Sequence, residues 1–454
     1  MTTDLTRGNP LKLILFFSIP LLIGNIFQQL YNMADTVIVG RTIGVGALAA
    51  VGATGTISFL ALGFITGLTA GFSVVTAQRF GAGDEDGVRR SFAAAIVLSV
   101  LFTAVMTAVL VVTARPMLEF LDTPEDIIDD SHSYILTIFI GLFATTLFNL
   151  LSNMIRALGD SRTPLIFLAI ACVTNIVLDF VLILTFHMGV AGAGIATVFS
   201  QFLSGVMCLV YMLKKFPILK ISGKDFKSCT GILKSSLLLG LPMGLQSVII
   251  AMGSMFVQVA VNRMGSGTVA GNTAAQKIDQ IGIQPLMSFG TTMATYVAQN
   301  YGANNIPRIR QGVRQCTFIA VIWSLLYGAF MIFFGKNVAA LVIGADQPAV
   351  VDISYIYLST CCPLELILAL LLIYRSSIQG LGKSLMPTLA GFVELAMRAS
   401  IVLLLAAPFG YAGVAFAGPM AWFGACVMCM ACYFHSMHKF KKTPPITAGT
   451  ELTI

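Results

Sequence analysis

Charged residues are scarce in this chain. Of its 454 residues, 10% are charged and 57% are hydrophobic, whereas a soluble domain carries about 25% charged residues. Such a composition cannot cover a surface exposed to water, which excludes a soluble globular protein. Apolar runs of roughly 20 residues recur from end to end, and this is the length of helix that crosses a bilayer. The runs are continuous rather than alternating, which excludes a transmembrane β-barrel and predicts an all-α polytopic membrane protein.

Histidine is also rare, and the cysteines show no disulfide or metal-binding pattern. The chain has 4 histidines and 9 cysteines. The histidines fall in loops or at the ends of apolar runs, without metal-ligand or catalytic spacing, so we expect neither enzyme activity nor a cofactor. Cys426, Cys429 and Cys432 are three apart, which is typical of small side chains between helices. The net charge of +7 is spread over short loops, which indicates membrane orientation rather than nucleic-acid binding.

The apolar runs predict twelve transmembrane helices. They cover residues 13–39, 47–72, 91–113, 133–155, 163–185, 190–213, 235–262, 269–298, 313–334, 353–376, 386–406 and 411–435. Most Lys and Arg residues outside the spans lie in one set of connecting segments, and the opposite set holds only Arg41, Arg115, Arg263 and Lys336. By the positive-inside rule we expect both termini to face the cytoplasm of a cell-membrane protein.

The chain repeats itself once. Pro20 matches Pro242 and Arg41 matches Arg263, a period of 222 residues, and QRFGA at 78–82 matches QNYGA at 299–303. Each half has six spans, so the halves share one orientation and form a parallel repeat. We therefore predict two six-helix lobes, an arrangement typical of alternating-access carriers. The predicted parts are an N-lobe (1–213), a basic cytoplasmic linker (214–234), a C-lobe (235–438) and a cytoplasmic tail (439–454).

Ionisable residues within the spans point to a site. A charge at the bilayer centre costs at least about 2.5–3.5 kcal/mol, so it usually has a partner or a function. The first span places polar residues on one helix face, namely Asn25, Gln28, Asn32 and Asp35. In the fifth span Asn175 and Asp179 are four apart. Asn and Gln could simply join helices by hydrogen bonds, but two carboxylates are poor structural links unless they share a proton or a cation.

These features together resemble the multidrug and toxic compound extrusion (MATE) family. The resemblance rests on the two six-helix halves, on Gln-x-x-Gly-Ala after the second helix of each half, and on Asn-x-x-Asp-x-x-x-Val-Gly-Arg at 32–41. It extends over about residues 11–438, nearest to the bacterial DinF-like and MepA-like members. The resemblance implies efflux of cationic drugs and dyes in exchange for H⁺ or Na⁺.

The family's N-lobe cation site consists of an Asp in the first helix, an Asn and an Asp in the fifth and a Thr in the sixth. The matching residues here are Asp35, Asn175, Asp179 and Thr197. One branch of the family has a second acidic site in the C-lobe, with an acid in the seventh helix. This chain has no acid in that helix, so ion coupling is expected in the N-lobe.

The remaining candidates are less specific. Glu394 and Arg398 are four apart and are expected to neutralise each other. Lys277 and Asp279 could line a cavity or pair across helices, and no role for Glu365 follows from the sequence. The resemblance places possible substrate contacts at Gln28, Asn32, Met252, Met255, Phe256, Phe289, Met293 and Tyr296. Methionine and aromatic side chains suit flat cations, but they are as common in packing or lipid contact.

The sequence thus predicts a secondary active multidrug efflux transporter. It would exchange cationic or amphipathic small molecules for H⁺ or Na⁺ by alternating access, as a monomer surrounded by membrane lipid. The resemblance suggests that the first helix bends at Pro20, although proline could equally fix a static kink. The alternative is a lipid-linked oligosaccharide or lipid flippase. Such a protein needs basic residues in its cavity, and only Lys277 and Arg398 qualify.

Overall fold

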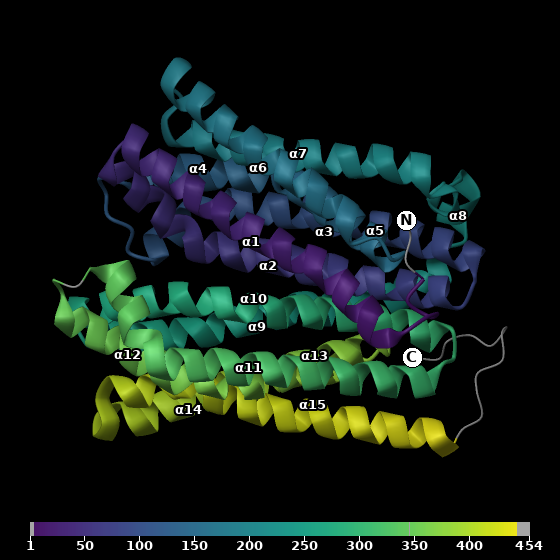
Figure 1. Ribbon diagram of the computed structural model, residues 1–454. Helices are drawn as coiled ribbons and strands as arrows, with labels where there is room; N and C mark the ends of the chain where they lie inside the picture. The colour runs from purple at the N-terminus through teal and green to yellow at the C-terminus, as the bar shows by residue number, and fades with distance from the viewer. Residues whose placement is uncertain (1–3, 345, 443–454) are drawn as a thin grey trace. The chain divides into compact units, whose positions relative to one another are not determined.

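The computed structural model describes residues 4–344 and 346–442, and within them every regular element is a helix (Figure 1). Contacts divide the chain into two compact units. Unit 1 consists of Met1–Asp4 and Ile23–Ser247, and unit 2 consists of Leu5–Leu22 and Val248–Ile454. The prediction of an all-α polytopic protein is confirmed.

Unit 1 is built from the helices of the first sequence half. Its elements are the later part of α1 (Pro10–Thr42), α2 (Val45–Gly81), α3 (Glu85–Phe120), α4 (Ile128–Ile140), α5 (Leu142–Ala157), α6 (Arg162–Phe180), α7 (Gly189–Lys215), the short α8 (Gly223–Lys227) and the start of α9 (Thr230–Asn262). A π-helical turn, Val181–Thr185, extends α6, and a 3-10 turn, Pro217–Leu219, precedes α8. The long helices lie side by side in Figure 1, with α2 packed on α3 and α5, and α7 on α5 and α6.

Unit 2 contains the rest of α9 and the helices that follow it. These are α10 (Ser266–Gly302), α11 (Ile306–Ile343), α12 (Pro348–Cys361), α13 (Glu365–Gly380), α14 (Leu385–Ala415) and α15 (Ala417–Lys442). A 3-10 turn, Cys362–Leu364, separates α12 from α13. The first part of α1 belongs to this core, where Ile14 and Phe17 are buried. The Ser18 and Thr292 hydroxyls form a hydrogen bond of 2.7 Å there.

The helices correspond to the predicted spans. Among the described residues, ten helical segments are long and apolar enough to cross a membrane, and the bent pair α4–α5 makes an eleventh. The remaining predicted span, 269–298, lies in α10, which has 37 residues. At about 1.5 Å per residue such a helix is longer than a bilayer core, but its polar side chains make it less apolar than the others. One of these polar side chains is Asp279.

Two predicted spans contain a break, and the start of a third differs from the prediction. The fourth span is broken at Gly141, where α4 and α5 meet at 44°. The tenth is interrupted at the turn containing Pro363, which lacks a backbone donor. Gly410 has a positive φ of 57° and kinks the chain, but α14 continues beyond it to Ala415, so the last span begins at Ala417 rather than at 411. It continues to Lys442, into the predicted tail, whose residues 443–454 lie outside the described part of the chain.

The packing units and the sequence halves differ by an exchange of helix segments. The change from one unit to the other falls between Leu22 and Ile23 within α1, and between Ser247 and Val248 within α9. The sequence places the corresponding boundary in the linker 214–234. Each unit therefore contains part of the first helix of the other sequence half, and the ranges 1–213 and 235–438 remain a prediction about the repeat.

Gly141 allows the α4–α5 break to approach α7. A methyl group at this position would overlap the side chain of Val198, which is adjacent to Thr197. We expect Gly141→Ala to lower the free energy of unfolding by about 1–3 kcal/mol, as overpacking does, measured by denaturant unfolding in detergent. Gly55→Ala is the control, because its added methyl meets no described atom within 4 Å. Equal stability of the two variants would show that the break relaxes at no cost.

Candidate functional site

Two carboxylates lie next to each other inside unit 1. Asp35 of α1 is 8% exposed, and Asp179 near the end of α6 is fully buried. Their carboxyl groups are close enough for one proton to join them in a hydrogen bond. No ion pair between described residues includes either of them. The structure thus brings together two residues that are far apart in the sequence, and no described residue is their basic partner.

Neutral polar groups surround this pair. Asn175 is buried one turn before Asp179 on the same face of α6, and Thr197 lies on α7. Each of these four residues has at least one buried side-chain oxygen without a hydrogen-bond partner among the described residues. More than about 90% of buried polar groups have a partner, and an unsatisfied one costs about 1–3 kcal/mol. Carboxylate, amide and hydroxyl oxygens are the groups that bind hard cations.

Two tyrosines complete the surroundings, and neither was predicted. Tyr31 lies one turn before Asp35 on α1 with its hydroxyl beside Thr197, and Tyr134 of α4 lies near both carboxylates. The spacing of Tyr31 from Asp35 is a signal that the sequence does contain. Tyr134 could be placed only by the packing of α4. Buried Ile183 and neighbouring apolar side chains enclose the group, which strengthens its electrostatic interactions.

The helix that carries Asp179 changes its geometry directly after this residue. The π-helical turn Val181–Thr185 begins two positions later, and the Phe186 amide donates to the carbonyl of Val181 at 3.2 Å. Single π-helical turns are frequent at functional sites. The irregular turn therefore agrees with the placement of Asp179 in a functional site.

The predicted substrate residues fall into two groups. Gln28 and Met255 are half-buried, and Asn32, Met252 and Phe256 are exposed. The polar face of the first helix is therefore not uniformly buried, and Asp35 alone among its four polar residues is enclosed.

The other three predicted substrate residues lie in the core of unit 2. Met293 and Tyr296 are fully buried and Phe289 is 8% exposed. The Tyr296 hydroxyl also donates to the carbonyl of Arg308 at 3.0 Å. These side chains hold unit 2 together, and a substrate could reach them only if that core opened.

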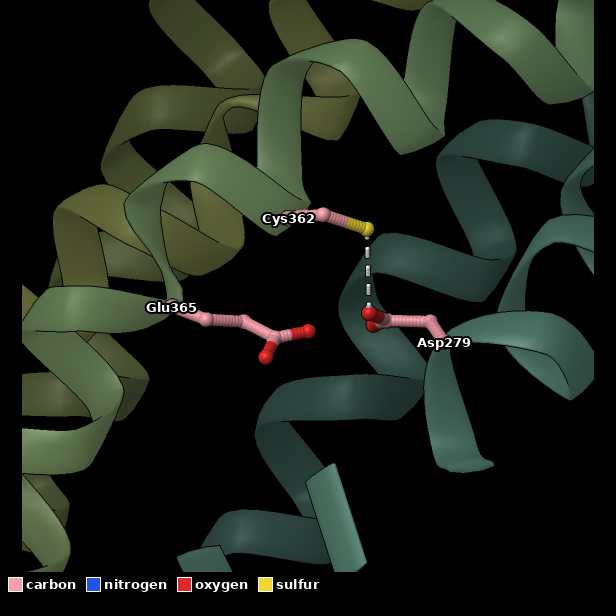
Figure 2. A group of neighbouring side chains, drawn as sticks. All are labelled: Asp279, Cys362 and Glu365. Carbon is pink, nitrogen blue, oxygen red and sulfur yellow. Dashed lines mark hydrogen bonds between the residues drawn. The ribbon is translucent and has the colours of Figure 1, made fainter. Parts of the chain in front are cut away.

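A second pair of buried carboxylates lies in unit 2 (Figure 2). Asp279 belongs to α10, and Glu365 is the first residue of α13 after the helix break. The thiol of Cys362 donates to Asp279 Oδ1 at 3.4 Å, and the Tyr357 hydroxyl donates to Oδ2 at 3.1 Å. Figure 2 shows the Glu365 carboxylate turned toward Asp279. Lys277, which the sequence offered as a possible partner across helices, is exposed.

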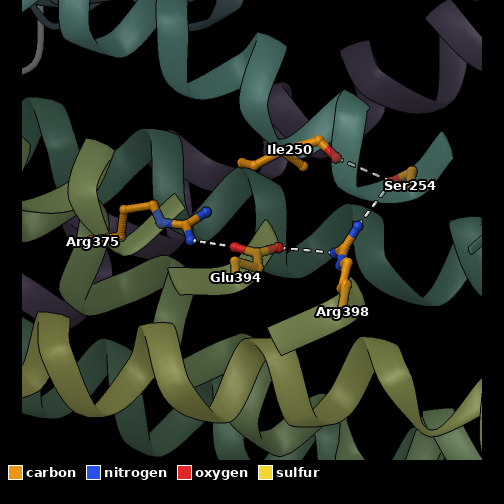
Figure 3. Close-up of polar contacts among 5 residues, drawn as sticks. All are labelled: Ile250, Ser254, Arg375, Glu394 and Arg398. Atoms are coloured by element: carbon orange, nitrogen blue, oxygen red, sulfur yellow. Dashed lines mark hydrogen bonds and ion pairs between the residues drawn. The ribbon is translucent and has the colours of Figure 1, made fainter. Parts of the chain in front are cut away.

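A buried ion-pair network joins three helices of unit 2 (Figure 3). Glu394 of α14 accepts from Arg398 at 2.9 Å, as predicted, and from Arg375 of α13 at 2.8 Å. Arg398 also donates to the Ser254 hydroxyl of α9 at 2.9 Å. Glu394 is therefore neutralised on both sides, and this network is structural.

Comparisons with known proteins agree with this fold. The family profile described as MatE matches residues 20–181 and 242–404. The chain is 34% identical to the "Probable multidrug resistance protein YpnP" of Bacillus subtilis, over 67% of this chain and 68% of that protein. It is 24% identical to "DNA damage-inducible protein F" of Escherichia coli, over 74% and 73% of the two chains.

A solved structure titled "Crystal structure of MATE in the bent conformation" superposes with a TM-score of 0.90 at 24% identity, covering 97% of this chain and 99% of that one. This likeness shows the fold, and the profile covers more than half of the chain in both sequence halves. The chain therefore belongs to the MatE family, the multidrug and toxic compound extrusion transporters, with the twelve-helix, two-lobe fold of that family.

Proposed function

We propose that the protein exports small cationic or amphipathic molecules in exchange for H⁺ or Na⁺ bound at Asp35 and Asp179. The observation that carries this proposal is the buried carboxylate pair with no basic partner among the described residues. The relative in Bacillus subtilis is named a probable multidrug resistance protein, which supports efflux of small molecules. The flippase alternative is weaker because Arg398, one of its two basic candidates, is neutralised by Glu394.

Ion binding changes the charge of this site. With both carboxylates ionised, two negative charges share an apolar environment, which is unfavourable. A proton shared by the carboxyl groups, or a sodium ion bound by the surrounding oxygens, removes one of these charges. Exchange then follows if the outward-open and inward-open conformations bind the ion with different affinity.

The first helix is suited to transmit this change. Residues of α1 up to Leu22 pack in unit 2, while Asp35 lies on the part that packs in unit 1. Pro20 lies two residues before this change of packing, where it removes one backbone hydrogen bond from the helix. We place the hinge of α1 at Pro20, in a cell-membrane protein whose termini both face the cytoplasm.

Transport in proteoliposomes tests this function. A fluorescent cationic dye is presented to inside-out proteoliposomes while a proton gradient or a sodium gradient is imposed separately. We expect dye uptake to follow one of the two gradients and to stop when an ionophore collapses it, because the ion supplies the driving force. Uptake that is independent of both gradients would contradict ion-coupled efflux and would make the flippase the next function to test.

A further inference from the structure

The carboxylates of Asp279 and Glu365 have no counter-charge within the described part of the chain. Glu365 is fully buried and Asp279 is 3% exposed. No ion pair between described residues includes either side chain, and Lys277 is exposed. Two ionised carboxylates in an apolar bundle are unfavourable, so at least one of them needs a bound ion.

Hydrogen bonds distinguish the two carboxylates. Both oxygens of Asp279 accept a hydrogen bond, from Cys362 and from Tyr357, and these two donors hold its carboxyl group in place. Both oxygens of Glu365 are buried without any partner among the described residues. One carboxylate oxygen each of Asp279 and Glu365 and the sulfur of Cys362 all lie within 4.8 Å of one another. A proton on Glu365 would give that side chain a donor directed at Asp279 (Figure 2).

The helix break holds this arrangement in place. Cys362 and Pro363 lie in the 3-10 turn, and Glu365 starts α13. A methyl group added at Gly328 of α11 would come within 2.7 Å of the Pro363 backbone, so α11 packs tightly against the turn. The helices that follow the two breaks, α5 and α13, both have 16 residues, so the two broken spans are equivalent in the repeat. The acids themselves have no counterparts there. Glu365, the first residue of α13, corresponds to Leu142, the first residue of α5. Asp279 corresponds to Ser58, at the same spacing as the matching segments QRFGA and QNYGA.

The groups that face Glu365 favour a proton over a metal ion. They are Asp279 of α10, Tyr327 of α11, Cys361 of α12 and Cys362 of the turn, and Tyr357 of α12 lies beside Asp279. None of these side chains is cationic at neutral pH. Hard cations prefer oxygen ligands over a thiol, and a metal ion on Asp279 would have to displace two hydrogen-bond donors.

We propose that Glu365 and Asp279 form a second ion-binding site, in which Glu365 takes up and releases a proton and Asp279 is its fixed hydrogen-bond acceptor. This site lies in unit 2 and is separate from Asp35 and Asp179 in unit 1. Its part in transport rests on the proposed antiport, but proton binding does not. The site would add one exchangeable proton per protein to any ion bound in unit 1.

Infrared difference spectroscopy of the purified full-length protein tests this directly. Spectra recorded on either side of a pH jump report the carbonyl band of each carboxylic acid that loses its proton. We expect Glu365→Gln to remove one such band and to lose one proton per protein in a parallel pH titration, while Asp35→Asn keeps the Glu365 band. Cys362→Ser is the matched control, because it keeps the number of carboxyl groups and the donor to Asp279.

Three results would overturn the proposal. The first is a band that persists unchanged in Glu365→Gln while this variant melts like the wild type. The second is a wild-type band that does not change across the accessible pH range. The third is loss of the wild-type band at constant pH when sodium chloride or zinc chloride is added. If Glu365→Gln fails to fold, Glu365→Asp keeps the acid and is expected to shift the band rather than remove it. Failure of dye transport with this band present would contradict the antiport and leave the proton site intact.

Discussion

Asp35→Asn and Asp179→Asn are each expected to abolish gradient-driven transport in the proteoliposome assay. An amide cannot take up a proton, and it removes one of the two charges that would attract a sodium ion. Coupling free energies between sites are typically 1–3 kcal/mol, which corresponds to roughly 5- to 150-fold. We therefore expect the ratio of uptake rates with and without the gradient to be at least about fivefold smaller in each variant than in the wild type. The initial rates of uptake with and without the gradient measure this directly.

Thermal melting separates lost ion binding from lost folding. A ligand present at about 100 times its dissociation constant stabilises the folded state by about 2.7 kcal/mol. The wild type should therefore melt at a higher temperature when the coupling ion is added, and both variants should lose this shift. Glu119→Gln is the control, because this acid of α3 is exposed and paired with Arg115. Full coupling in Asp35→Asn would show that the assigned site is wrong.

Glu394→Ala is expected to destabilise unit 2 by about 3–5 kcal/mol, the usual cost of breaking a buried ion pair. The variant leaves Arg375 and Arg398, which are about as buried as Glu394, without their shared carboxylate. The positive charges would then lie in an apolar environment without the carboxylate that neutralises them. Denaturant unfolding in detergent, or the yield of folded protein after mild heating, measures the loss.

A surface ion pair provides the matched comparison. Lys336 and Asp352 are 2.7 Å apart, but both side chains are more than half exposed. Asp352→Ala should therefore cost at most about 1 kcal/mol. If the two variants lose the same stability, the network around Glu394 does not hold α13, α14 and α9 together. Wild-type stability of Glu394→Ala would also contradict a structural role.

Glu394, the pair Asp35 and Asp179, and the pair Asp279 and Glu365 thus differ in their partners. Glu394 lies between two guanidinium groups, which neutralise its charge. Asp35 with Asp179, and Asp279 with Glu365, have no basic partner among the described residues. A permanently paired acid is suited to holding helices together, whereas an unpaired acid is suited to binding and releasing an ion. This contrast is the physical basis for assigning transport roles to the two unpaired groups.

Much of the architecture followed from composition and periodicity. Scarce charge and long apolar runs are sufficient to predict membrane helices, because a bilayer excludes unpaired backbone and charged groups. The repeat of Pro20 and Pro242 predicted two equivalent halves. The spacing of Asn175 and Asp179 predicted a shared helix face, because the helical period fixes which residues are neighbours.

Tertiary structure alone decided the rest, because it depends on contacts between residues far apart in the chain. The periodicity of one helix does not show which helix it packs against. The sequence therefore determined the membrane fold, its repeat and the acids of the N-lobe. Only packing decided that α1 and α9 change units within their length, and that Tyr134 lies near the N-lobe acids. Packing also decided that Glu365 faces Asp279, while Arg375 pairs with Glu394.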